Sequence, residues 1–204
     1  MVVILEEKSK IYNKKKKIIE KYNSTSDFYD KRYKAIQEEK YEIALKNYKD
    51  NKNHLLDLGC GTGLLFEYFI NSNLEKEIIK NNYIGVDISW NMLLKFKSKS
   101  SKSEYTEYSP NLILADIEHL PFRKNIFYSI FSFTSFQNLP DTKIGIKELL
   151  LVSKNNAYFK FSILKKNLEL DSLLRILKTN LKEVSILQKQ NLEDVIIQGR
   201  IFKA

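Results

Sequence analysis

The chain has 204 residues, 43% of them hydrophobic, which is enough for one well-filled domain and too little for two. No apolar run approaches 18 residues, and Met1–Leu5 is too short for a signal peptide, so we expect a cytoplasmic protein without a membrane span. The single cysteine, Cys60, excludes an internal disulfide and a cysteine-based metal cluster, and we expect no metal site.

The net charge of +9 favours a polyanionic partner such as RNA, because Lys and Arg neutralise phosphates. Only four of the 34 basic residues are Arg, the side chain suited to bidentate recognition of phosphates and bases. Lys, Asn and Ile are all abundant, as an A/T-rich coding sequence would also produce. The charge is therefore modest evidence for RNA.

Residues 1–53 are highly charged and predicted to be helical, and we expect them to form an extension in front of a domain over residues 54–204. The basic run Lys14–Lys17 is interpreted as a solvated helix face. Further along, the sequence offers a helix N-cap at Ser24, Thr25, Ser26 or Asp27. The helix after it is predicted to bury one face, which carries Tyr33, Ile36, Gln37, Lys40, Tyr41 and Ala44.

The segment Leu55–Leu65, LLDLGCGTGLL, is typical of a buried strand that runs into a glycine loop and then a helix. Its glycines do not fit the G-x-G-x-x-G pattern of dinucleotide sites, because Leu64 stands where the third glycine is required. A phosphate-binding P-loop would need a lysine at that same position. The loop therefore disfavours NAD, FAD, ATP and GTP.

Three successive predicted strands end in an acid. Asp57 follows the first strand, Asp87 closes the second (YIGVD), and Asp116 closes the third (NLILAD). An acid at the tip of the second strand is placed to accept both ribose hydroxyls in a nucleoside-binding α/β unit. Ser89 is the predicted N-cap of the helix that follows the second strand.

The remaining elements alternate between strands and helices, which predicts a parallel sheet with helices on both faces. They are a surface loop at Lys97–Pro110, a strand at Asn125–Phe133, a helix capped by Asp141 or Thr142, a strand at Ala157–Leu164, a helix at Leu168–Leu181, and an antiparallel hairpin of Val184–Gln190 with Asp194–Phe202.

The pattern D-x-G-x-G-x-G from Asp57 to Gly63, with DISWNML from Asp87 to Leu93, resembles the class I S-adenosylmethionine (SAM) dependent methyltransferases. The resemblance implies a three-layer αβα fold with a seven-stranded, mostly parallel sheet and an antiparallel C-terminal hairpin. SAM carries a sulfonium and an ammonium but no phosphate, so a carboxylate suits it better than a lysine. The alternative is a strand-turn-helix whose glycines only turn the chain.

The resemblance also implies which residues bind SAM. Asp57 would lie near the methionine amino group, Asp87 at the ribose, and Asp116 with the backbone of Ile117 at the adenine. Met92 is almost equally consistent with plain helix core. The expected cofactor residues are Asp57, Gly59, Cys60, Gly61, Gly63, Asp87, Ile88, Met92, Asp116, Ile117 and Phe133.

Two features bear on the methyl acceptor. Many family members carry a Tyr-rich preface that closes over the cofactor, which makes Tyr22, Tyr29 and Tyr33 lid candidates; ordinary packing against the sheet is the alternative. After the fourth strand, TSFQNLPD lacks the N/D-P-P-Y/F signature of nitrogen methylation, and Gln137 and Asn138 are assigned to the acceptor pocket. The stretch resembles both quinone C-methyltransferases and RNA methyltransferases that use a small zinc-ribbon activator protein.

Three functional hypotheses follow. The first is a SAM-dependent methyltransferase acting on tRNA, rRNA or the translation machinery, and the Tyr-rich preface favours it slightly. The second is a methyltransferase of a small metabolite such as a quinone or another lipid-like molecule. The third is a non-catalytic module that binds SAM or a partner.

Overall fold

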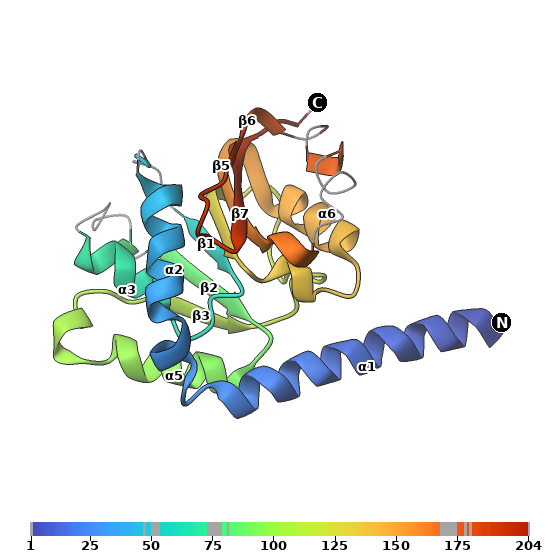
Figure 1. The fold of residues 1–204 in the computed structure, drawn as a ribbon, viewed down its shortest axis with the longest axis horizontal. Coiled ribbons are helices and arrows are strands. Elements are labelled where there is room, and N and C mark those ends of the chain that lie inside the picture. Colours follow the sequence, from blue (N-terminus) through green and yellow to red (C-terminus); the bar gives the residue numbers. More distant parts are fainter. Residues whose placement is uncertain are drawn as a thin grey trace.

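The computed structural model describes residues 2–46, 48–49, 54–72, 79–80, 82–167, 175–177, 179 and 181–203 (Figure 1). The strands are β1 (Leu55–Leu58), β2 (Tyr83–Asp87), β3 (Asn111–Leu114), β4 (Phe127–Phe133), β5 (Ser153–Leu164), β6 (Leu181–Leu187) and β7 (Asp194–Ile201). The helices are α1 (Val2–Thr25), α2 (Tyr29–Leu45), α3 (Leu64–Asn71), α5 (Trp90–Ser100) and α6 (Thr142–Val152), with short 3-10 turns η1 (Ser103–Tyr105), η2 (Phe136–Asn138) and η3 (Lys165–Asn167).

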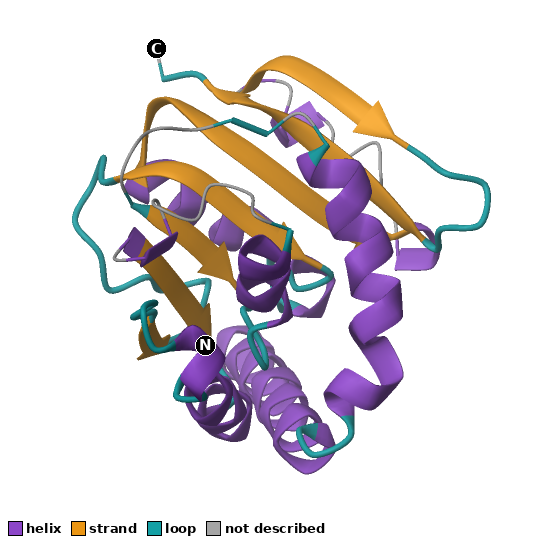
Figure 2. Cartoon of the chain, turned by 90° about the vertical axis from the view of Figure 1, so that its left-hand side faces the viewer, coloured by secondary structure: helices purple, strands orange, loops and turns teal. Residues whose placement is uncertain are grey.

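The strands form one sheet in the order β3-β2-β1-β4-β5-β7-β6, seen as a twisted layer in Figure 2. The pairs from β3 through β5 are parallel, and β7 runs antiparallel to both β5 and β6. This arrangement confirms the predicted seven-stranded sheet and its C-terminal hairpin. Because β1 lies between β2 and β4, the carboxyl ends of these three strands meet at one edge of the sheet.

Helices cover both faces of the sheet, as the predicted three-layer fold requires. On one face, Ile146 of α6 belongs to a core cluster that includes Ile130 of β4. On the other, Phe66 of α3 and Phe96 of α5 share a cluster with Phe131. Ile130 and Phe131 are neighbours whose side chains enter opposite layers, because successive residues of a strand point to opposite faces.

Two helix starts agree with the predicted caps. The side chain of Ser89 accepts a hydrogen bond from the Met92 amide at the start of α5. The side chain of Asp141 accepts one from the Lys143 amide at the start of α6, so Asp141 rather than Thr142 is the cap. Both side chains satisfy amide groups that have no partner within the helix.

The predicted cap at Ser24–Asp27 is wrong. Helix α1 runs on to Thr25, and the Ser24 and Thr25 hydroxyls donate to the Lys21 carbonyl of that helix. Helix α2 begins after Phe28, which makes no side-chain cap hydrogen bond. The predicted buried face of α2 is confirmed at Gln37, Lys40, Tyr41 and Ala44. Ile36, however, is exposed.

The predicted surface loop Lys97–Pro110 is only partly a loop. Helix α5 continues to Ser100, and Tyr105 in η1 is buried, with its ring centroid 6.2 Å from that of Phe66. Leu181 begins β6 rather than ending a helix, and most of the predicted helix Leu168–Leu181 lies outside the described residues. None of the described helices is long and apolar enough to cross a membrane.

A buried ion pair joins α2 to the sheet. Lys40 Nζ lies 2.9 Å from Asp194 Oδ1 of β7 and donates to Thr134 Oγ1 at 2.7 Å, while Asp194 Oδ2 accepts from Ser162 Oγ. Burial lowers the pKa of Lys40, and the negative charge of Asp194 works against that shift. Thr134 follows β4 with φ 60°, a strained value for a β-branched residue that these contacts hold in place.

We expect Lys40→Met to lower the free energy of unfolding by about 3–5 kcal/mol, because it leaves the buried Asp194 carboxylate unpaired. Chemical denaturation followed by circular dichroism measures the change. The double variant Lys40→Met/Asp194→Leu should recover most of the loss, and Lys16→Met, at an exposed position of α1, serves as the control. A double variant no more stable than the single one would contradict this account of the ion pair.

Candidate cofactor and acceptor site

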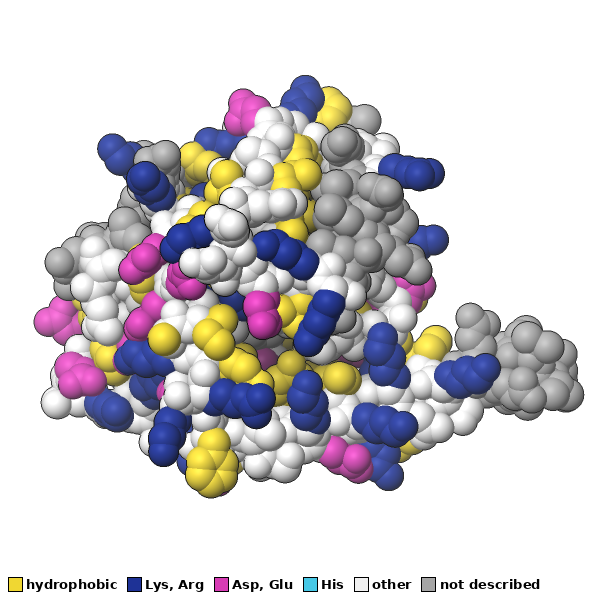
Figure 3. Space-filling view, in the orientation of Figure 1, with side chains coloured by type: hydrophobic (Ala, Val, Ile, Leu, Met, Phe, Trp, Pro, Cys, Tyr) yellow, Lys and Arg dark blue, Asp and Glu magenta, His cyan; other side chains and the backbone are white. Residues whose placement is uncertain are grey.

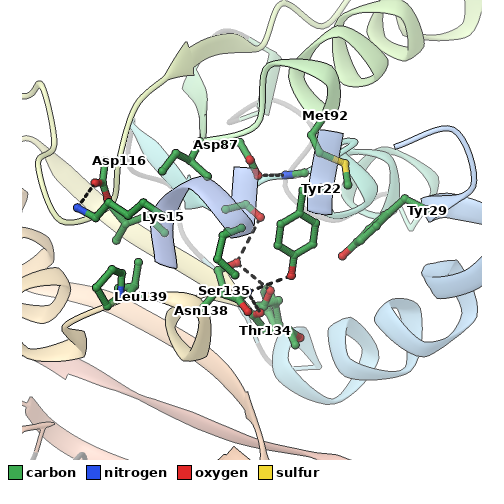
Figure 4. Close-up of a pocket in the computed structure, with 17 residues that line it drawn as sticks. Lys15, Tyr22, Tyr29, Asp87, Met92, Asp116, Thr134, Ser135, Asn138 and Leu139 are labelled. Carbon is green, nitrogen blue, oxygen red and sulfur yellow. Dashed lines mark hydrogen bonds and ion pairs between the residues drawn. The ribbon is translucent and has the colours of Figure 1, made fainter. Parts of the chain in front are cut away.

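A cavity opens at the carboxyl edge of the sheet, beneath α1 (Figure 4), and encloses about 690 Å3 of space that includes its solvent-filled mouth. The residues that line it and were predicted as site residues are Tyr29, Gly59, Gly61, Asp87, Ile88, Met92, Asp116, Ile117, Phe133 and Asn138. Met92 is also buried in α5, so its position fits helix core as well as it fits the predicted contact with the cofactor.

A smaller cavity adjoins the first and shares Tyr29, Gly59, Gly61 and Phe133 with it. Asp57 and Cys60 line this smaller cavity. The two cavities therefore lie side by side at the glycine loop.

Three predicted site residues line neither cavity. An added Cβ on Gly63 would lie 2.4 Å from the Phe96 ring, so this glycine allows close packing of α5 against the loop. Gln137 accepts a hydrogen bond from the Leu164 amide of β5. The Tyr33 ring contacts that of Tyr29, with centroids 4.8 Å apart.

The glycine loop forms a backbone cradle. Gly59 and Gly61 have φ values of 77° and 53°, in the left-handed region that favours glycine. The Gly59 amide donates to the Val86 carbonyl at 2.7 Å, which fixes the loop against β2. A Cβ built on Gly61 would meet nothing within 4 Å, so at this position the bare backbone faces open space. A ligand can therefore approach the chain closely at Gly61.

Two carboxylates face these cavities, of which Asp57 is buried and Asp87 half-buried. Burial raises the pKa of Asp57 to about 7, although the Tyr83 hydroxyl donates a hydrogen bond to it. Burial also raises the pKa of Asp87, which accepts hydrogen bonds from the Gly61 and Ser89 amides at 2.9 and 2.8 Å. Neither carboxylate forms an ion pair with any described side chain. Buried negative charge of this kind favours a cationic ligand.

The third acid, Asp116, is paired. Its Oδ2 lies 2.5 Å from Lys15 Nζ of α1, and Lys15 also lies 2.5 Å from Glu118 Oε2. The pKa of Lys15 is raised, because its hydrogen bonds to the two carboxylates outweigh the opposing effect of burial. Lys14 donates to the Leu139 carbonyl at 2.5 Å. Lys15 is thus half-buried and holds α1 at the site, which corrects its interpretation as part of a solvated face, whereas Lys14, Lys16 and Lys17 are exposed as that interpretation expects.

The far end of the larger cavity is lined by polar groups that bind each other. Asn138 Nδ2 donates to the Tyr22 hydroxyl at 3.0 Å and to the Thr134 carbonyl at 3.3 Å, and Figure 4 shows these side chains grouped together. Burial raises the pKa values of both Tyr22 and Tyr29, so both phenols are neutral near pH 7. Neither phenol is therefore a base near pH 7.

Sequence reasoning missed several lining residues: Lys15, Ile18, Thr134, Ser135, Leu139 and Pro140. Lys15, Ile18 and Tyr22 are spaced three and four residues apart, so they share one helix face, and this spacing could have revealed them. The others follow β4 directly, where the site of a parallel sheet is expected.

The model of a methyltransferase domain family matches residues 56–161, just over half of the chain. The chain belongs to this family. It is 30% identical over 196 residues to an uncharacterized protein of Methanocaldococcus jannaschii, covering 94% of this chain and 70% of that protein. It is 32% identical over 113 residues to a malonyl-[acyl-carrier protein] O-methyltransferase of Hamiltonella defensa, covering 55% of this chain but only 38% of the relative.

Two solved methyltransferases share the fold of this one. Magnesium protoporphyrin IX methyltransferase from Synechocystis, solved with bound SAM, superposes with a TM-score of 0.70 at 14% identity, over 93% of this chain and 97% of that one. A putative methyltransferase of Haloferax volcanii in complex with the Trm112 activator superposes with a TM-score of 0.65 at 11% identity, over 89% and 98%.

SAM is the cofactor of this methyltransferase, and the residues present fit it. Asp57 is buried and Asp87 half-buried, neither carboxylate pairs with a cation among the described side chains, and SAM supplies an ammonium and a sulfonium. The smaller cavity has no Lys, Arg or His among the described residues that line it, as suits a cationic ligand rather than a phosphate.

The raised pKa of Asp57 predicts a pH-dependent cofactor affinity. Below pH 7 the carboxyl is mostly protonated and neutral, so it attracts the ammonium less. We expect S-adenosylhomocysteine to bind about eightfold more tightly at pH 7.5 than at pH 6, as isothermal titration calorimetry would measure. Asp57→Asn is the matched control and should remove most of this dependence. The same dependence in Asp57→Asn would show that another group causes it.

Proposed function

We propose that this methyltransferase acts on a small, mostly apolar acceptor that enters the covered cavity and brings its own nucleophile. The observation that carries the proposal is the position of α1. Lys15 ties this helix to the residues after β3, and Tyr22 ties it to η2, so that Ile18 lies over the cavity between them. An acceptor held under a helix in this way is shielded from water, as methyl transfer from a sulfonium requires.

The residues at the end of the larger cavity nearest Asn138, which we call the acceptor end, favour a methyl acceptor that is already nucleophilic. Its lining residues there are Tyr22, Thr134, Ser135, Asn138, Leu139 and Pro140, none of which carries a charge. The phenols stay protonated, and the Thr134 hydroxyl donates to Asp194. Without a general base beside it, a neutral alcohol would react poorly. A carboxylate, a thiolate or a neutral amine needs no proton removed before attack.

For the cofactor we propose the following roles. Asp57 faces the methionine ammonium, Asp87 accepts the ribose hydroxyls, and the backbone of Gly59 and Gly61 lies along the methionine and ribose. Asp116 accepts the adenine amino group while its other contacts remain with Lys15 and the Glu118 amide. Bound SAM supplies an electrophilic methyl group, and the residues of this chain orient it and exclude water.

RNA is the second candidate acceptor. Five exposed lysines lie along α1: Lys10, Lys14, Lys16, Lys17 and Lys21. Figure 3 shows Lys and Arg side chains gathered along this helix. Such a row attracts phosphates. The enclosed cavity favours a small molecule over a base that must remain attached to a polynucleotide, so RNA stays a prediction.

A zinc-ribbon activator also stays a prediction, and one feature supports it. Strand β3 lies at the edge of the sheet, where β2 is its one paired neighbour among the described strands, and its Leu114 is 52% exposed. A free edge with an exposed apolar side chain is a site where a partner strand can add to a sheet. The Haloferax volcanii neighbour shows that a protein of this fold assembles with such an activator.

Incubation with methyl-labelled SAM tests the acceptor class. The purified chain is mixed with an RNA extract or with a small-molecule filtrate, both from cells that lack the gene. We expect label in the small-molecule fraction and none in RNA. Asp87→Ala, which should not bind the cofactor, is the control for non-enzymatic methylation. Label in a ribonuclease-sensitive fraction would replace the proposal with the RNA candidate, and SAM binding without any transfer would favour a non-catalytic module.

A further inference from the structure

The smaller cavity extends beneath α2, a helix that precedes the family-matched residues 56–161. Gln37 of α2 is 5% exposed and lines this cavity together with Asp57, Gly61 and Thr62. No motif of the family assigns a role to this glutamine. It lies on the predicted buried face of α2, where an apolar residue would be the ordinary choice.

The amide group of Gln37 is only partly satisfied. The Gln37 side chain lies near the Tyr29 hydroxyl and slightly offsets the rise that burial causes in the pKa of that phenol. The Gln37 Oε1 atom is buried and has no hydrogen-bond partner among the described residues. A buried acceptor without a partner costs free energy, and most buried polar atoms in folded proteins are paired. An unpaired acceptor that lines a cavity therefore indicates a donor on a ligand.

Several contacts hold helix α2 in the position where Gln37 lines the smaller cavity. The Thr62 hydroxyl of the glycine loop donates to Asp30, and Lys34 Nζ lies 2.6 Å from Glu67 of α3. The Tyr41 and Phe133 rings meet edge to face, with centroids 4.9 Å apart. These contacts hold Gln37 in place before a ligand arrives, so little conformational entropy is lost on binding.

We propose that Gln37 Oε1 accepts a hydrogen bond from the ammonium group of the SAM methionine, across the smaller cavity from Asp57. An ammonium has three donors and no acceptor, so it can bind a carboxylate and an amide oxygen at once. No Lys, Arg or His among the described residues lines the cavity to compete for these acceptors. The inference rests on SAM as cofactor, and it adds a cofactor-binding residue, Gln37, that the sequence motifs do not include.

One consequence concerns the organisation of the chain. A boundary at residue 53 would separate Gln37 from Asp57, although both would hold the same group. Helix α2 is then part of the cofactor-binding unit rather than an appended extension. The family-matched residues would form an incomplete methionine subsite without it.

The test compares three ligands by isothermal titration calorimetry with the full chain. S-adenosylhomocysteine has the amino group, its deaminated analogue keeps the carboxylate only, and 5′-methylthioadenosine lacks both. We expect Gln37→Met to weaken S-adenosylhomocysteine binding about tenfold or more, since hydrogen bonds to charged groups are strong. Binding of the other two ligands should stay the same. Gln190→Met, the same substitution at an exposed position, is the matched control.

Equal weakening of all three ligands in Gln37→Met, or no weakening of any, would overturn the proposal. Gln37→Glu keeps an acceptor at the same place, so it should bind S-adenosylhomocysteine at least as well as the natural chain. Loss of that binding in Gln37→Glu, with 5′-methylthioadenosine still bound, would also overturn it. Failure of the natural chain to bind any of the three would refute the cofactor site itself, which distinguishes the two outcomes.

Discussion

The site depends on two carboxylates that form no ion pair with any described side chain. Asp57 and Asp87 lie at the ends of neighbouring parallel strands, and the sheet order brings both to one edge. Their raised pKa values measure how unfavourable ionisation is there. A ligand that carries positive charge removes this cost, whereas a phosphate would increase it. The same constraint explains why the loop beside them uses glycines and no lysine.

The two N-terminal helices build the other walls of the site. Helix α2 is joined to the sheet through the Lys40–Asp194 ion pair, which also holds Thr134 at the acceptor end. Helix α1 reaches across the cavity and contacts the residues after β3 and β4. The parallel sheet thus supplies the cofactor contacts, and the helices enclose the space in which the acceptor is proposed to lie. Both helices lie before the family-matched segment.

The features that could be predicted from the sequence are those that depend on local patterns of residues. Strands, the acids that end them, and the caps at Ser89 and Asp141 each depend on residues a few positions apart. The contacts of Lys15 with Asp116 and of Lys40 with Thr134 join residues 101 and 94 positions apart, and no local pattern indicates them. The four polar residues Ser24–Asp27 resembled a helix start, but the hydroxyls of the first three bind carbonyl groups of the preceding helix. Tyr105 stands in a polar stretch of the sequence, and its burial comes from contact between its ring and that of Phe66 in α3.

The burial of Cys60 has a consequence for the chemical reactivity of its thiol. Its side chain is 6% exposed and packs over Gly85, where an added Cβ would lie 2.9 Å from the sulfur. Burial raises the pKa of this thiol, so the reactive thiolate is scarce in the folded protein. Alkylating reagents therefore react with Cys60 only when the glycine loop moves away from β2. Because the chain has one cysteine, the alkylation rate reports how often this region opens, and comparison with global unfolding shows whether it opens alone.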